Sequence, residues 1–248
     1  YTDILKAKNE KLLAILLDPD KIVWNTLEDL ISKINQSPAT HIFIGGSLVE
    51  TTILDELIVR LKQKINLPIV LFPGNPSQIS AEADAILFLS LISGRNPDFL
   101  IGHHIQSALE LNELNLEVIP TAYLLIDGGT QSSVAYVSQT TPIPRHNSTV
   151  VKQIVLAAKF QGKKIVYLDA GSGALYCVQE EMIRMVSKLG LPLIIGGGVR
   201  DIDSLRAIHE AGANVVVIGN KLETDIDFLL EIHAYKTASE IEINKSNR

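Results

Sequence analysis

Short apolar runs alternate along the whole chain with longer stretches in which apolar residues recur every three or four positions. The run Leu12–Leu17 is wholly apolar, which is typical of a strand covered on both faces. In the next stretch Leu27, Ile31 and Ile34 recur at helical spacing. This alternation of strands and helices favours an α/β protein built on a parallel sheet.

The pattern continues through eight strand–helix units. The expected strands are 12–17, 41–46, 68–74, 85–90, 116–126, 164–170, 192–197 and 214–219. The expected helices are 25–34, 53–65, a short one after Pro76, 101–114, 150–160, 179–189, 201–212 and 225–235. Eight units in a chain of 248 residues favour a closed (β/α)8 TIM barrel that forms one domain over residues 1–248. An open doubly wound sheet is the alternative, because periodicity does not show closure.

One long stretch, 127–147, interrupts the regular pattern between the fifth expected strand and its helix. It has no clear helical or strand periodicity. A connection of this length inside a compact domain is usually either functional or disordered. We therefore expect 127–147 to be one or the other.

Glycine-rich turns follow the sixth, seventh and eighth expected strands. In a barrel the C-terminal strand ends open onto one face, where active sites lie. Glycines let backbone N–H groups approach an anion, and the helix beginning near Asp201 would add its positive end. We interpret the turns as a phosphate site, although tight turns alone would also need glycine. The residues assigned to this site are Gly171, Ser172, Gly173, Gly197, Gly198, Gly219 and Asn220.

Acidic residues also stand at strand ends. Asp18 ends the first strand in "LLDPDK", and Ser47 follows the second in "IGGS". Oxygen ligands suit Mg²⁺, which commonly bridges one or two carboxylates to substrate phosphates. Asp169 ends the sixth strand beside the expected phosphate site, where a carboxylate can take the proton of an attacking hydroxyl. The alternative for Asp169 is a buried acid bonded to loop N–H groups.

Two basic residues are candidates for binding pyrophosphate. Lys21 follows Asp18 in the first loop, and Arg145 lies in "TPIPRHN". The planar fork of an arginine matches phosphate oxygens, although a solvated loop arginine is an equal alternative for Arg145.

Composition excludes several classes of protein. The net charge of −6 argues against nucleic-acid binding, which usually needs a basic patch. The single Cys177 excludes an internal disulfide and a multi-cysteine zinc site. The apolar runs fall short of the roughly 18 residues that span a membrane, and no signal-peptide pattern is visible. We expect a cytoplasmic protein.

Together these segments resemble the geranylgeranylglyceryl phosphate synthase family, which includes the bacterial heptaprenylglyceryl phosphate synthases. The matching segments lie in order along nearly the whole chain: "LLDPDK", "IFIGGS", "LFPGNPSQIS", "LFLSLISGRNPDFLIGHH", "TTPIPR", "YLDAGSGA", "IIGGGVRD" and "VVVIGN". "SGRNP" and "TTPIPR" are most similar to the longer members of the family, from some archaea and Bacteroidetes-type bacteria.

The resemblance implies a modified (β/α)8 barrel that joins a polyprenyl diphosphate, of the geranylgeranyl class, to the 3-hydroxyl of sn-glycerol 1-phosphate and releases pyrophosphate. It implies Mg²⁺ on Asp18 and Ser47, and a homo-oligomer, either dimer or hexamer. The prenyl tail implies an apolar trough, with 85–93 and 98–102 as candidate walls, and transient contact with a membrane surface. The resemblance places glycerol phosphate on Tyr167, Leu168, Asp169, Ala170, Gly171, Ser172, Gly173, Gly197, Gly198, Gly219 and Asn220.

Two departures from the family stand out. The family usually carries Glu where this chain has Asp169, and an acid and a lysine commonly follow "PIPR", where this chain has His146 and Asn147. The shorter side chain of Asp169 is expected to affect the reaction rate. The change at His146 and Asn147 is expected to affect pyrophosphate binding. Two other functions stay open at this point: another phosphate-binding barrel enzyme, such as a phosphosugar isomerase or lyase, and a non-catalytic phospholigand-binding scaffold.

Overall fold

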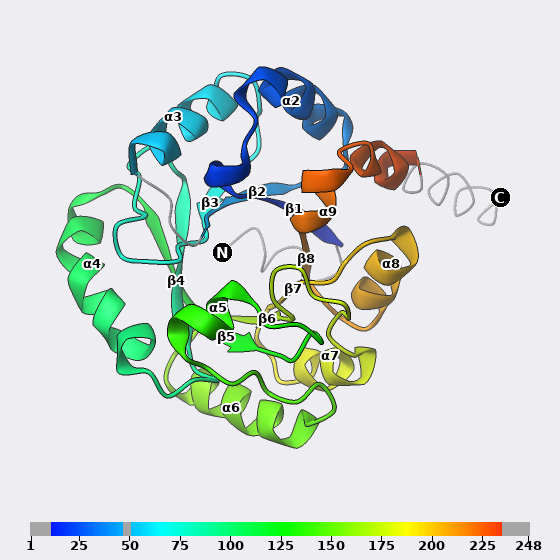
Figure 1. Ribbon diagram of the computed structural model, residues 1–248. Helices are drawn as coiled ribbons and strands as arrows, with labels where there is room; N and C mark the ends of the chain where they lie inside the picture. The colour runs from blue at the N-terminus through cyan, green and yellow to red at the C-terminus, as the bar shows by residue number, and fades with distance from the viewer. Residues whose placement is uncertain (1–10, 47–50, 235–248) are drawn as a thin grey trace.

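The computed structural model describes residues 11–46 and 51–234. Eight parallel strands form a closed barrel in sequence order, and β1 pairs with β8 to close it (Figure 1). The (β/α)8 prediction is therefore confirmed, and the open sheet is excluded. The strands are β1 (Leu12–Leu17), β2 (His41–Ile44), β3 (Ile69–Leu71), β4 (Ala85–Leu91), β5 (Glu117–Leu125), β6 (Ile165–Asp169), β7 (Leu193–Gly196) and β8 (Val215–Ile218).

Helices surround the barrel in an outer ring (Figure 1). They are α2 (Leu27–Gln36), α3 (Thr51–Lys62), α4 (His103–Glu113), α6 (Ser148–Phe160), α7 (Glu180–Ser187) and α8 (Ile202–Glu210), and residues 228–234 are also helical. Shorter helical segments are η1 (Pro19–Lys21), η2 (Trp24–Thr26), the π-helical η3 (Asp98–Gly102), α5 (Ser133–Ser138) and α9 (Asn220–Thr224). Each helix of this set is too short or too polar to cross a bilayer, as are residues 228–234.

Alternation along the strands separates two cores. Inward-facing residues such as Ala14, Phe43 and Tyr167 fill the barrel, and outward-facing residues such as Ile15 and Leu168 pack under the helices. Successive side chains of a strand point to opposite faces. The last residue of β6 therefore shares the inward face of Tyr167, and this places the side chain of Asp169 at the mouth of the barrel.

The connection from β3 to β4 carries no helix, so the helix expected after Pro76 is wrong. The side chain of Gln78 accepts from the backbone N–H of Gly74 at 2.7 Å and donates to the carbonyl of Gly46 at 2.8 Å. The Asn75 carboxamide accepts from the backbone N–H of residue 77 at 2.9 Å. Such local side-chain bonds compete with helical pairing.

The long connection after β5 is more ordered than its sequence indicates. It contains α5, whose first turn is capped by Ser132 accepting from the backbone N–H of Ala135 at 3.2 Å. Gln139 ends the helix in the left-handed conformation, with φ of 53°. A bridge between Ile126 and Ile143 fixes the far end of the connection. The segment therefore places α5 over the mouth of the barrel (Figure 1).

Candidate active site

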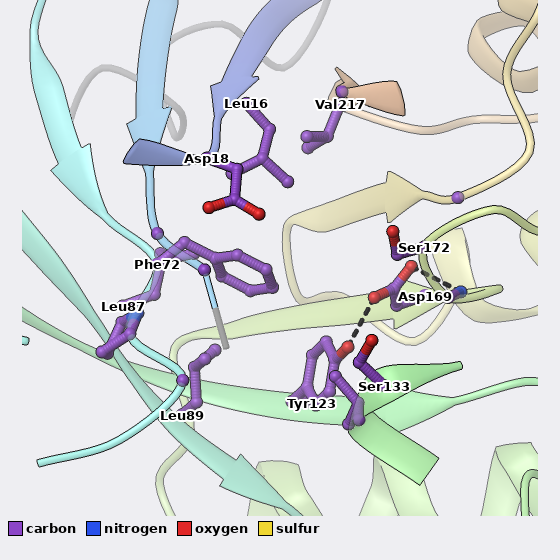
Figure 2. Close-up of a pocket in the computed structure, with 18 of the residues that line it drawn as sticks. Leu16, Asp18, Phe72, Leu87, Leu89, Tyr123, Ser133, Asp169, Ser172 and Val217 are labelled. Carbon is purple, nitrogen blue, oxygen red and sulfur yellow. Dashed lines mark hydrogen bonds between the residues drawn. The ribbon is translucent and has the colours of Figure 1, made fainter. Parts of the chain in front are cut away.

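A cavity of about 810 Å³ opens at the C-terminal mouth of the barrel. The loops after β1, β6, β7 and β8 line one part, and β4, α4, α5 and the β3–β4 connection line the rest. Figure 2 shows Asp18 and Asp169 projecting into it from different strands. The expected site residues that line it are Asp18, Lys21, Tyr167, Asp169, Gly171, Ser172, Gly173, Gly197, Gly198, Gly219 and Asn220.

Asp169 is the buried acid of this cavity, only 8% exposed. One carboxylate oxygen accepts from the Tyr123 hydroxyl at 2.5 Å, and the other accepts from the backbone N–H of Gly171 at 2.8 Å (Figure 2). Burial raises the pKa of Asp169, and these two hydrogen bonds partly oppose that rise. Burial and the neighbouring carboxylate raise the pKa of Tyr123 well above its usual range. The phenol therefore stays a donor to the acid.

The loops after β6 and β7 touch through their backbones. Gly197 has φ of 83°, and a Cβ on it would lie 2.8 Å from the amide nitrogen of Gly171 and 2.9 Å from a carboxylate oxygen of Asp169. No side chain fits between these loops, so this part of the wall is peptide backbone. The structure agrees here with the sequence interpretation that the glycines let main chain reach the cavity.

The loop after β8 is tied to the loop after β6 by Asn220. Its carboxamide oxygen accepts from the backbone N–H of Gly173 at 2.9 Å and from the hydroxyl of Ser172 at 3.1 Å. Its amide group donates to Glu223 at 3.1 Å. Asn220 therefore holds Ser172 and Gly173 at the cavity edge, in addition to the donor role assigned to it from sequence.

The positive helix end expected near Asp201 carries a side-chain cap. The carboxylate of Asp201 caps α8 by accepting from the backbone N–H of Ser204 at 2.7 Å, and Asp201 lies outside the cavity lining. The cap uses one of the N–H groups of this helix end, and of the preceding loop Val199 and Arg200 line the cavity. Residues of α9, which begins at Asn220, also line the cavity.

Asp18 and Lys21 meet at the first strand end. The carboxylate of Asp18 accepts from the backbone N–H of Asp20 at 3.2 Å and lies 3.6 Å from the ammonium of Lys21. Lys21 also donates to Glu223 at 2.9 Å. Burial raises the pKa of Asp18, since this half-buried carboxylate loses hydration that a cation would replace.

The donor set at Asp18 fits a metal that is shared with a substrate. No group of three or more His, Cys, Asp or Glu side chains suited to a metal occurs within residues 11–46 and 51–234. Mg²⁺ needs no such cage, because it keeps waters and takes one or two carboxylates with phosphate oxygens. Ser47, the other expected ligand, lies outside the described residues.

Three expected site residues face away from the cavity. Leu168 and Ala170 are buried between the barrel and its helices, so only their main chain can contribute. The guanidinium of Arg145 stacks on the ring of Tyr176, 4.1 Å from its centroid. None of the three is among the described residues that line the cavity.

Several lining residues were missed from sequence. Tyr123 is an inward-facing tyrosine near the end of an apolar strand, a signal that alternation alone could have supplied. Phe72 follows β3 and stacks on Tyr167 with ring centroids 5.2 Å apart. Val134 and Val137 come from α5, and nothing in their sequence context marks them.

The remaining wall of the cavity is mostly apolar, although polar side chains of α4 also line it. Leu87 and Leu89 of β4 lie on this side (Figure 2), and Phe99 of η3 is also in the lining. Ile79, from the helix-free β3–β4 connection, lines the same region. The expected trough walls at 85–93 and 98–102 therefore both contribute residues to the cavity.

Comparison with known proteins places the chain in a family. It matches the PcrB family over residues 3–237. The chain belongs to the PcrB family. A geranylgeranylglyceryl phosphate synthase from Flavobacterium johnsoniae is 54% identical over 231 residues, covering 92% of this chain and 95% of the relative. The corresponding synthase from Korarchaeum cryptofilum is 38% identical over 235 residues, covering 94% and 96%. The resemblance seen in the motifs is confirmed.

Solved structures agree with this membership. The (S)-3-O-geranylgeranylglyceryl phosphate synthase from Thermoplasma acidophilum, solved with sn-glycerol-1-phosphate, is 32% identical with a TM-score of 0.87, covering 93% of this chain and 94% of that one. A tryptophan synthase α-subunit from Pyrococcus furiosus has a TM-score of 0.55 at 14% identity, covering 90% and 95%. The second likeness shows the shared barrel fold alone.

Proposed function

We propose that this PcrB-family chain is a prenyltransferase. It joins a polyprenyl group of the geranylgeranyl class, carried as its diphosphate, to the 3-hydroxyl of sn-glycerol 1-phosphate. The observation that carries this proposal is one cavity with a glycine-walled end and an apolar arm, with the buried Asp169 on the cavity wall. The names of the relatives and the glycerol phosphate bound by the Thermoplasma acidophilum protein support it.

In this proposal the glycine-walled end holds the phosphate of the acceptor. Main-chain groups of the loops after β6, β7 and β8 surround this end, and Arg200 lines it with its guanidinium fixed to the carbonyl of Ala174 at 2.8 Å. The N–H groups of Gly171 and Gly173 already donate to Asp169 and Asn220, so the proposal assigns the phosphate to the main chain of the loops after β7 and β8 and to Arg200. Backbone N–H groups and a cation stabilise negative charge without bulk. The phosphate then orients the rest of the glycerol toward Asp169.

Asp169 acts as the proton acceptor. The acceptor's 3-hydroxyl oxygen forms a bond to the first carbon of the prenyl chain while the bond from that carbon to the diphosphate oxygen breaks. The proton of the hydroxyl passes to the carboxylate, and the electron pair of the broken bond leaves with pyrophosphate. The hydrogen bonds from Tyr123 and Gly171 fix the carboxylate so that its remaining lone pairs are available to the hydroxyl.

The diphosphate end lies at Asp18 in this proposal. Asp18 would hold Mg²⁺ together with oxygens of the diphosphate, with Ser47 as a further ligand by resemblance. The metal, when bound, neutralises negative charge on the leaving group. Lys21 lines the same edge and adds a second positive charge. Arg145 would need to leave the ring of Tyr176 to reach a diphosphate. We therefore assign it a smaller contribution to diphosphate binding than Lys21.

The apolar arm accepts the prenyl tail. Its lining includes Phe72, residues of β4, Phe99 and Ile79 from the connection without a helix. A phosphosugar isomerase or lyase would have no use for such an arm, and this disfavours that alternative. The buried carboxylate of Asp169, held by Tyr123 and a loop N–H, fits both an enzyme and a scaffold, so a turnover assay separates those two.

The setting of the enzyme is also part of the proposal. We expect a cytoplasmic homo-oligomer, a dimer or a hexamer, that touches a membrane surface transiently to exchange its lipid tail. The side chains of Ile105 and Leu109 are 70% and 82% exposed, four residues apart on α4. An apolar stripe of this kind supports a subunit interface.

A direct assay tests the proposed function. Purified protein, Mg²⁺ and geranylgeranyl diphosphate are incubated with sn-glycerol 1-phosphate or, separately, with sn-glycerol 3-phosphate, and the extracted ether lipid is measured. The proposal predicts product with the first acceptor only, lost on chelation of the metal. No product at any prenyl length, despite bound glycerol phosphate, would favour the scaffold.

A further inference from the structure

A second cavity lies outside the barrel, between α4 and α6, which are neighbours in the outer ring (Figure 1). Its volume is about 520 Å³, and we call it the α4–α6 groove. Nothing in the proposed reaction uses it. The residues that line it are Phe88, Ser90, Ile92, Gly94, Arg95, Leu100, Ile101, His104, Ile154, Ala157, Ala158, Gln161 and Lys163.

One end of the α4–α6 groove is polar and cationic. The ammonium of Lys163 donates to the hydroxyl of Ser90 at 2.5 Å, and the Nε2 atom of His104 lies 3.4 Å from the same hydroxyl. Ser90 is 3% exposed and His104 7% exposed. The Nδ1 atom of His104 is buried and has no hydrogen-bond partner among the described residues. Arg95 adds a second cation at the rim.

The charge at this end is not balanced within the groove. No Asp or Glu is among the described residues that line it. Burial lowers the pKa of Lys163, because the ammonium loses hydration there. A partly desolvated cation beside a hydroxyl, an imidazole and a guanidinium is a favourable environment for an anion, and phosphate oxygens accept from all four.

The rest of the α4–α6 groove is mostly apolar. Leu100 and Ile101 of η3 line it together with Ile154 and Ala157 of α6. Phe88 of β4 is also in the lining, and Gln161 is the polar residue outside the cationic end. A ligand that fills both parts must carry a negative headgroup on a hydrocarbon tail.

We propose that the α4–α6 groove binds an organic phosphate with a hydrocarbon tail. Its phosphate contacts Lys163, Ser90 and His104, and its tail lies between α4 and α6. This inference does not rest on the proposed function. Phe88 and His104, whose rings lie 4.2 Å apart, line both this groove and the main cavity. The test must therefore separate the two cavities.

The first experiment is a calorimetric titration with dodecyl phosphate in the absence of Mg²⁺, which disfavours the diphosphate end of the main cavity. Lys163→Met removes the buried cation, and Lys164→Met removes its exposed neighbour as a matched control. We expect the first variant to lose at least tenfold in affinity and the second to stay within twofold of the parent. Inorganic phosphate alone should bind at least tenfold more weakly than dodecyl phosphate. Equal affinities for the two variants would overturn the proposal.

A second variant and a mapping experiment guard against a folding defect. Arg95→Gln, at the exposed rim, should lose a smaller part of the affinity while the melting temperature stays unchanged. An alkyl phosphate that carries a photoreactive diazirine on its tail should label residues of α6, which line this groove and not the main cavity. Labelling confined to the main cavity would contradict the assignment.

A comparison of vesicles with monomeric dodecyl phosphate shows whether the ligand is a membrane lipid or a free amphiphile. Vesicles that contain phosphatidic acid, with phosphatidylcholine vesicles as control, present the same phosphate monoester as a membrane headgroup. Lys163-dependent binding to the first vesicles would support the proposal with a bilayer lipid as ligand. Lys163-dependent binding of dodecyl phosphate alone would support it with a free amphiphile. No Lys163-dependent binding in either arm would reject it.

Discussion

The two sides of the barrel mouth are built from different parts of the chain. On the side of β6, β7 and β8 the wall is main chain, and Gly197 has no room for a Cβ. On the side of β3 and β4 the wall is side chain, from Phe72, Leu87 and Leu89. The first wall can position a small anion, and the second can only shape a space for an apolar group. Each side therefore suits one of two substrates.

The proposed proton acceptor lies between these two sides. Phe72 stacks on Tyr167, whose neighbour on the inward face of β6 is Asp169. Tyr123, from β5, donates to that acid and packs against Phe72 with centroids 5.9 Å apart. Three aromatic rings thus pack together beside the acid, in the same cavity as the apolar side chains of β4.

Removing the acid between the two sides should have the largest effect. Asp169→Asn keeps the shape but cannot take a proton, so kcat should fall by roughly 10²- to 10⁴-fold. Binding of glycerol phosphate, measured by calorimetry, should change little. Asp169→Glu, which restores the acid common in the family, should recover most of the rate. Unchanged turnover in Asp169→Asn would show that another group accepts the proton.

Filling the main-chain wall should have the next largest effect. In Gly197→Ala the new Cβ would press on the amide of Gly171 and on Asp169. We expect kcat/KM for glycerol phosphate to fall by roughly 100-fold, or about 3 kcal/mol, with KM for the prenyl diphosphate nearly unchanged. Gly162→Ala is the matched control, because Gly162 has nearly the same φ, 82°, and a Cβ added there would meet no other described residue within 4 Å. If kcat/KM falls equally in the two variants, backbone strain alone explains the effect of Gly197→Ala.

Truncating the side-chain wall should act on the other substrate. Leu89→Ala removes apolar contact from the arm, so KM for the prenyl diphosphate should rise by roughly tenfold, the effect of about 1–2 kcal/mol of lost contact. KM for glycerol phosphate should stay within twofold. Leu89→Met, which conserves volume, serves as the control. A change in the glycerol phosphate KM of similar size would mean that the two sides are not separate.

Removing the hydrogen bond from Tyr123 to Asp169 should shift the pH profile. The bond from Tyr123 lowers the pKa of Asp169, so Tyr123→Phe should raise it. The carboxylate accepts a proton only when it is ionised, and the rate therefore falls as pH drops through its pKa. The acid limb of the kcat profile should move to higher pH in the variant. If the acid limb stays in place or moves to lower pH, the titration of Asp169 does not set that limb.

The sequence was sufficient for the features that depend on local pattern. Alternation and helical spacing predicted all eight strands and most helices, and the glycines marked the main-chain wall. The strand pattern also located Asp169. Alternate side chains of a strand point to the same face, so the last residue of β6 points the same way as Tyr167.

Features that depend on distant contacts were not visible in the sequence. The helix expected after Pro76 is absent because Gln78 bonds to the backbone of Gly46, thirty-two residues away. Arg145 stacks on Tyr176 instead of facing the cavity, and no spacing indicates that pairing.

The most direct test of the two-sided site is a crystal structure with sn-glycerol 1-phosphate, Mg²⁺ and an unreactive thio-analogue of geranylgeranyl diphosphate. We expect the phosphate against Gly197 and Gly198, the tail along Leu87 and Leu89, and the 3-hydroxyl within roughly 3 Å of a carboxylate oxygen of Asp169. A phosphate bound on the β4 side, or a 3-hydroxyl turned away from Asp169, would contradict this assignment.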